Sequence, residues 1–160
     1  RKRFDVQYSL GQTPIEQVAI PTKSRDELPP VLAALQWVFT NPQINEEVFA
    51  VLEANICHPK KATGRPGMDL WHILVLAVVR LALDCDYDRL ELIANHDSLV
   101  RAILGIHDEF GQPKKTFSVK TIGNNVALLD EATLSEINAI IVAHGREVMP
   151  KKRAKKSRPR

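Results

Sequence analysis

Cysteine is scarce in this chain of 160 residues, which has only Cys57 and Cys85 and no CxxC motif. Two cysteines cannot form the disulfide framework that stabilises small secreted domains, so reduced thiols in an intracellular protein are the simplest interpretation. Aromatic residues are also few, at 6% of the chain, and there are seven glycines. Because 44% of the residues are nevertheless hydrophobic, the composition favours a helical globular protein.

The signatures of several enzyme classes are missing. The sequence contains no GxxxxGK[ST], GxGxxG or GxSxG motif. Its five histidines are scattered without an i, i+4 pair, and the adjacent Cys57 and His58 are poorly spaced as metal ligands. Many carboxylates stand at expected helix starts, where capping explains them. We therefore predict no self-sufficient active site, and no metal or cofactor bound by this chain.

The longest apolar run, from Leu70 to Leu83, has fourteen residues and is interrupted only by His72 and Arg80. It is shorter than the roughly 20 apolar residues that cross a bilayer. The chain does not open with a charged segment followed by an apolar one, as a secretory leader does. We predict no membrane partner and a cytoplasmic location.

The same run predicts the centre of the fold. A helix that is apolar nearly all round is buried among other helices, so Leu74, Val78 and Leu81 are all expected in the core. A polar break at 84–86 and another at 95–97 separate this helix from two shorter amphipathic ones, the second ending at Gly105. Three helices in sequence predict a compact trihelical unit, and its commonest functional form is the helix-turn-helix.

The flanking segments extend the helical pattern. Residues 1–25 are expected to form an extended N-terminal arm, and 26–149 a single helical domain. Within it we expect a helix pair before the central helix, capped at Asp26 and Asn45, and two helices after it, over 118–129 and 130–145, capped at Ser118 and Asp130. The predicted fold is all-α: seven helices in a compact bundle around a central buried helix.

Charge is distributed unevenly. The formal net charge is +3, yet the tail at 150–160, PKKRAKKSRPR, holds seven of the 22 basic residues and no acid. The rest of the chain carries 15 basic and 19 acidic residues, a net charge of −4. A mildly acidic body with a strongly basic tail predicts a polyanionic partner. The tail is expected to be disordered alone, and a solvated linker is the alternative.

Two helices could contact DNA. The helix over 87–95 carries Asp88 and Glu91, which would repel phosphates, whereas lysines and hydroxyls surround the start of the helix over 119–129. Asn124 and Asn125 have amides able to pair with adenine. Ordinary core helices with solvated polar faces are the alternative. The residues predicted to bind DNA are Lys114, Lys115, Thr116, Ser118, Lys120 and Asn124, with Lys60, Lys61 and Arg65 of a linker and Lys151, Lys152, Arg153, Lys155 and Lys156 of the tail.

The stretch GRPGMDLWHILVLAVVRLALDCDYDRLELIANHDSLVRAILGI, residues 64–106, resembles the N-terminal domain of bacterial insertion-sequence transposases of the InsH-like DDE class. The resemblance rests on the GRP element at 64–66, on the YDRL at 87–90 and on the ILGI at 103–106. Residues 116–138 are similar to the helix pair that follows in that family. In order and motif the match covers residues 26–149.

The resemblance implies a part in DNA transposition at the bacterial nucleoid. The family's front domain is taken to bind the terminal repeats of the element and to help pair subunits, which suggests a homodimer and no small-molecule substrate. The catalytic RNase H-like domain, with three carboxylates and divalent metal ions such as Mg²⁺, would follow the tail. No acid of this chain matches that triad, so the chain is expected to be non-catalytic alone. The alternative is a helical protein–protein module that dimerises or inhibits the transposase and contacts DNA only through the tail.

Overall fold

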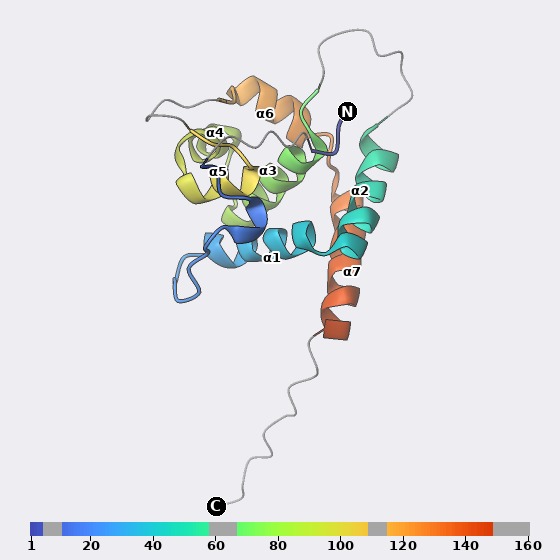
Figure 1. Cartoon of the computed structure of the whole chain (residues 1–160). Coiled ribbons are helices and arrows are strands. Elements are labelled where there is room, and N and C mark those ends of the chain that lie inside the picture. The colour runs from blue at the N-terminus through green and yellow to red at the C-terminus, as the bar shows by residue number, and fades with distance from the viewer. Residues whose placement is uncertain (5–10, 58–66, 109–114, 149–160) are drawn as a thin grey trace, which may run out of the picture.

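The structure, a computed structural model, describes residues 1–4, 11–57, 67–108 and 115–148. Within these residues all regular secondary structure is helical and there is no strand, which confirms the all-α prediction (Figure 1). The elements are η1 (Ile15–Gln17), α1 (Leu28–Thr40), α2 (Pro42–Ile56), α3 (Leu70–Leu83), α4 (Tyr87–His96), α5 (Ser98–Leu104), α6 (Val119–Val126) and α7 (Glu131–Val148).

Helix α3 is the centre of the bundle, as predicted. Helices α1, α2, α4, α5 and α6 all pack against it, and α7 packs along α2 (Figure 1). Every residue from Leu70 to Ala77 is buried. The last turn of α3 differs from the expectation, because Leu81 is 58% exposed and Val78 is only half-buried. This turn borders an open groove, so an apolar sequence all round the helix does not bury its whole length.

The N-terminal arm completes the start of α3. Asp69 occupies the N-cap position, but its side chain accepts no hydrogen bond from the helix. Instead, the backbone N–H groups of Leu70 and Trp71 donate to the carbonyls of Lys2 and Arg3, both over 3.0 Å. The ring of Phe4 packs edge-on against His72, with centroids 5.8 Å apart. The Phe4 side chain and the backbone of residues 2 and 3 are therefore integrated with the body of the fold.

The N-cap of helix α2 lies four residues before the predicted cap, Asn45. Its N-cap is Asn41, whose side-chain oxygen accepts a hydrogen bond from the N–H of Ile44 (3.3 Å), and Pro42 follows in the first turn. Asparagine at the N-cap and proline just after it both favour helix initiation. The Asn41-Pro42 pair that was expected only to end α1 therefore also starts α2.

The break between α3 and α4 lies at 84–86 as predicted, and Asp84 has the left-handed backbone (φ 46°) of a helix end. The second break is shorter than expected, because α4 runs to His96 and only Asp97 separates it from α5. One residue suffices here, since the Asp97 carboxylate accepts hydrogen bonds from the N–H groups of both Leu99 and Val100 (3.0 Å each). Gly105 ends α5 with φ 75°, confirming its predicted role.

Helix α6 is shorter than predicted and ends at Val126; residues 127–129 form a turn before Asp130 caps α7. Ile122, Val126 and Leu129 lie on one face and are buried. Val119, at the corresponding position of the first turn, is 37% exposed. Side chains of a helix lean toward its N-terminus, so a first-turn residue extends past the start of the helix rather than over its packed face.

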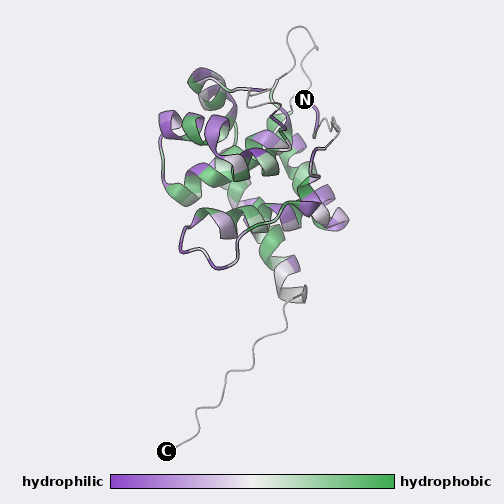
Figure 2. Ribbon diagram, turned by 60° about the vertical axis from the view of Figure 1, so that its left-hand side comes forward, coloured by the Kyte–Doolittle hydropathy of each residue, from purple (hydrophilic) through white to green (hydrophobic). Residues whose placement is uncertain are grey.

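The hydrophobic residues gather in one core. Figure 2 shows the hydrophobic colour concentrated on the helices in the middle of the molecule and the hydrophilic colour on the peripheral turns. In the segments that the structure describes, no helix has both the length and the hydropathy needed to span a membrane.

Candidate nucleic-acid interface

Helix α6 packs closely on α4 and α3. A Cβ added at Gly123 would lie 3.8 Å from the nearest ring atom of Tyr87, so the α6 backbone approaches the α4 side chain within ordinary van der Waals contact. The guanidinium of Arg80, from α3, lies 4.5 Å from the centre of the same ring. Tyr87 thus connects three helices, and a cation over an aromatic ring adds to the packing.

A buried asparagine fixes the residue that precedes the α6 cap. The Asn95 side chain, on α4, accepts a hydrogen bond from the N–H of Phe117 (2.7 Å) and donates one to its carbonyl (2.8 Å). The Phe117 ring is buried edge-on to His72, 5.9 Å between centroids. Because both backbone groups of one residue are held by one side chain, the start of α6 has little freedom relative to α4.

A buried arginine fixes the segment just before Phe117. The Arg101 side chain is only 3% exposed and donates to the carbonyls of Ala94 (2.8 Å) and Lys115 (2.7 Å). It also forms a two-pronged ion pair with Asp108, over 2.8 and 2.6 Å. A fully hydrogen-bonded arginine is the type of buried charge that proteins tolerate. It holds residue 108 and residue 115 to the end of α4.

These contacts leave a polar surface around α6. The exposed polar side chains there are Lys115, Thr116, Ser118, Lys120, Thr121 and Asn124, and two apolar side chains, Val119 and Leu128, are exposed as well. Ser118 caps the helix, because its hydroxyl accepts from the N–H of Thr121 (3.1 Å). The Lys115 ammonium lies 5.5 Å from the centre of the Phe117 ring. Five of the predicted DNA-binding residues therefore share one surface; Lys60, Lys61, Arg65, Lys114 and the five tail residues lie outside the described residues.

The two neighbouring asparagines have different environments. Asn125 is engaged within the protein: its amide nitrogen donates to the carbonyl of Thr121 (2.7 Å), and its oxygen accepts from the Arg1 guanidinium (2.7 Å). Asn124 is exposed on the outward face. Of the two amides expected to be able to pair with adenine, Asn124 is therefore the one presented to solvent.

The other short helices present less suitable surfaces. On α5, Val100, Ile103 and Leu104 are buried together with Arg101, so little of this helix faces outward. The exposed residues of α4 are of mixed character: Asp88, Arg89, Leu92 and His96. Helices α3, α4 and α5 do contact one another pairwise. The interpretation of this unit as a helix-turn-helix stays a prediction.

His72 has a structural environment. Its Nε2–H donates to the carbonyl of Leu104 (2.9 Å), and the neighbouring Trp71 donates to the carbonyl of Ile103 (2.9 Å), so the two side chains cap the end of α5. Burial lowers the pKa of His72 from 6.5 to about 4, and the positive charge of Lys115 adds to that shift. The ring is therefore neutral near pH 7. Across the described segments, no three His, Cys, Asp or Glu side chains form a group suited to a metal ion.

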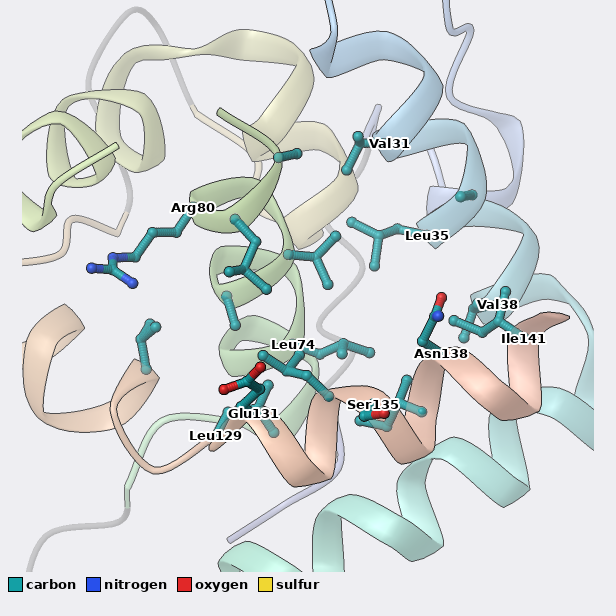
Figure 3. A pocket seen from close by; sticks show the side chains of 18 of the residues that line it. Val31, Leu35, Val38, Leu74, Arg80, Leu129, Glu131, Ser135, Asn138 and Ile141 are labelled. Carbon is teal, nitrogen blue, oxygen red and sulfur yellow. The ribbon is translucent and has the colours of Figure 1, made fainter. Parts of the chain in front are cut away.

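An apolar groove of about 860 Å³ lies between α1, α3 and the first turns of α7, and it reaches Tyr87 and the end of α6 at Val126 (Figure 3). Side chains from the three helices face it, including Leu35, Leu74 and Ile141. Exposed Leu81 also lines it. Arg80 extends away from these apolar groups at one edge.

Three residues that build the α6 surface are not apparent from the sequence: Asn95, Arg101 and Arg1. The Asn-His-Asp sequence at 95–97 suggests a chain break and gives no sign that Asn95 holds another segment. Arg101 occupies a position in a short amphipathic helix where an arginine is normally solvated. Their partners are 22, 14 and 124 residues away, so no local pattern reveals the contacts.

A comparison of the chain with protein-family models, with curated proteins and with solved structures finds no significant match. The resemblance to transposase N-terminal domains therefore remains an expectation from the sequence motifs. The chemistry of the α6 surface is the evidence on which a function is proposed.

Proposed function

We propose that this chain is a DNA-binding domain that contacts DNA through the outward face of α6. The observation that supports the proposal is the gathering of exposed lysine, hydroxyl and amide side chains on one helix that buried hydrogen bonds hold in place. Lysines, hydroxyls and helix N-termini bind phosphates, whereas an exposed asparagine can recognise an adenine edge. A rigidly positioned polar surface of this composition suits a polyanion better than an apolar partner.

The dimensions of α6 suit a groove of DNA. An α-helix with its side chains is about 10–12 Å across and the major groove is about 12 Å wide, so α6, with its eight residues, can lie in that groove. In this arrangement Lys115 and Lys120 bind backbone phosphates, and Thr116 and Ser118 lie near a phosphate at the helix start. Asn124 faces a base. The residues of the basic tail add sequence-independent affinity.

The motif resemblance gives the proposal its biological form. We infer that the chain is the N-terminal region of an insertion-sequence transposase and binds the terminal repeats of the element during transposition. Strand cleavage would then belong to a separate RNase H-like domain with divalent metal ions. The chain itself contributes DNA recognition and takes no small-molecule substrate.

The test is fluorescence anisotropy with labelled duplexes, one carrying the element's end sequence and one scrambled, over a salt series. The double variant Lys115→Glu, Lys120→Glu should bind about ten-fold more weakly or worse at 0.1 M salt, because two phosphate contacts become repulsive. The matched control is Lys23→Glu, Arg25→Glu, which changes net charge equally at two exposed residues before α1. Wild-type affinity in the α6 variant, or the same loss in both variants, would contradict the proposal.

A second candidate function is favoured by the groove between α1, α3 and α7. Its apolar lining and the exposed Leu81 are typical of a surface that binds another protein. In that case the chain is a dimerisation or trans-inhibitory module, and its DNA contact comes only from the tail. Deleting residues 150–160 distinguishes the two functions: in the first, sequence-preferring DNA binding survives the deletion, and in the second, all DNA binding is lost. Light scattering of the same proteins reports whether a homodimer forms.

A further inference from the structure

Residues 1–4 of the N-terminal arm are held firmly beside α6. The guanidinium of Arg3 forms ion pairs with Glu46 (2.6 Å) and Glu53, both on α2, and lies over the ring of Phe49. The backbone carbonyls of residues 2 and 3 bond to the start of α3, and Phe4 is packed against the core. The arm is therefore positioned by polar, ionic and apolar contacts together (Figure 1).

The two arginines of the arm differ in how their charge is used. Arg3 is neutralised within the protein, and its hydrogen bonds lower the pKa of both Glu46 and Glu53. Arg1 is exposed, and its guanidinium donates to two neutral groups, the carbonyl of Met68 (3.1 Å) and the side-chain oxygen of Asn125 (2.7 Å). The positive charge of Arg1 is thus placed at the side of α6 without being compensated by these partners.

The place of Arg1 on α6 suggests its target. Asn125 lies on the flank of the helix, one residue along from the outward-facing Asn124 and one turn from Thr121, to which it is hydrogen-bonded. An α-helix with its side chains is about 10–12 Å across, so a helix lying in the major groove has each flank next to a phosphate backbone. A cation on the flank of the helix therefore faces phosphates.

We propose that Arg1 contacts a backbone phosphate of the DNA that α6 binds, so that the arm and the helix form one two-part interface. This inference rests on the proposed function of α6. A phosphate contact carries no sequence information, so the arm adds affinity and fixes the orientation of the helix. Asn124 and Arg1 therefore have separable roles: the first gives sequence preference, the second gives salt-dependent affinity.

The test measures the slope of log affinity against log salt for wild type, Arg1→Gln and Asn124→Ala. Arg1→Gln should weaken binding about five-fold, equally for the specific and the scrambled duplex, and should reduce the slope by about 0.9. Asn124→Ala should reduce the preference for the specific duplex and leave the slope unchanged. Arg1→Lys should restore the slope, since it keeps the charge.

The matched control is Lys23→Gln, which removes one exposed positive charge from the segment before α1. Circular dichroism and melting of every variant verify the fold. A wild-type slope in Arg1→Gln, or an equal reduction in Lys23→Gln, overturns the inference and leaves the α6 function standing. If the wild-type chain shows no binding to either duplex at low salt, both the inference and the proposed function fail.

Discussion

The α6 surface and the groove between α1, α3 and α7 are built by different forces. Around α6, two buried polar side chains, Asn95 and Arg101, form directed hydrogen bonds to the backbone of Phe117 and Lys115. The groove is lined mainly by aliphatic side chains, with a few polar ones at α7, and has an exposed leucine in its wall. Directed hydrogen bonds allow one arrangement of the helix, whereas aliphatic contacts tolerate repacking.

The difference shows where precision is required. A helix that presents particular groups to a ligand must be held in one orientation, and hydrogen bonds to its first residues do this without using the exposed face. A wall of leucines and valines stabilises the fold by burial, and its exposed part can contact partners of different shapes. Three predictions test this contrast, and the largest effect is expected in the apolar region.

Leu74→Ala should lower the free energy of unfolding by about 3–4 kcal/mol, because it removes a fully buried side chain from α3. The matched variant on the same helix is Leu81→Ala, for which we expect a change of less than about 0.5 kcal/mol, since this leucine is largely exposed. Urea unfolding followed by circular dichroism measures both. Equal effects of the two substitutions would mean that the groove is closed in solution.

Asn95→Ala should cost about 2–3 kcal/mol, because it leaves the N–H and carbonyl of Phe117 buried without partners. Hydrogen exchange of the α6 amides should also become faster relative to those of α2. The control is Asn55→Ala on α2, an exposed amide that donates to the carbonyl of Val51, one turn before it. If Asn95→Ala and Asn55→Ala have the same stability and exchange rates, the hydrogen bonds of Asn95 to Phe117 do not hold the start of α6 in place.

Acidification should destabilise the protein through His72. The pKa of His72 in the folded chain is about 4 and that of an unfolded histidine is about 6.5, so between these values the unfolded chain binds more protons. The contribution of neutral His72 to the free energy of unfolding is fully present above pH 6.5 and decreases as the pH falls, by about 1–1.5 kcal/mol at pH 5.5. Urea titrations at pH 7 and pH 5.5 should show a smaller loss for His72→Gln than for wild type. A parallel decline would contradict the lowered pKa.

The sequence predicts the fold well where one residue decides a local structure. Gly105 and Asp130 occupy the predicted helix ends, and the apolar run from Leu70 forms the central helix. The errors occur where the same residue type permits two outcomes. Asn41 ends one helix and starts the next, and Asp97 alone replaces an expected three-residue break.

The candidate site was predictable only in its outer part. Lysines and hydroxyls near a helix start can be recognised from their spacing, and Lys115, Ser118 and Lys120 do lie together. The exposure of Leu81 and the contact of Arg1 with Asn125 could not be predicted, because both depend on which helices pack beside them. Hydrophobic periodicity identifies faces of helices and carries no information on how far a neighbour extends along them.

The hydrogen bonds from the first N–H groups of α3 to the carbonyls of Lys2 and Arg3 have a consequence for dissecting the molecule. The trihelical stretch looks like a module that could be cut out and transplanted, yet its first turn is completed by Lys2 and Arg3, from the N-terminal end of the chain. A fragment that begins near Gly67 would lack the acceptors for the N–H groups of Leu70 and Trp71, and it would lack the Phe39 and Phe49 rings that contact Trp71. Helices α3, α4 and α5 are therefore contiguous in the sequence but do not form a structurally independent unit.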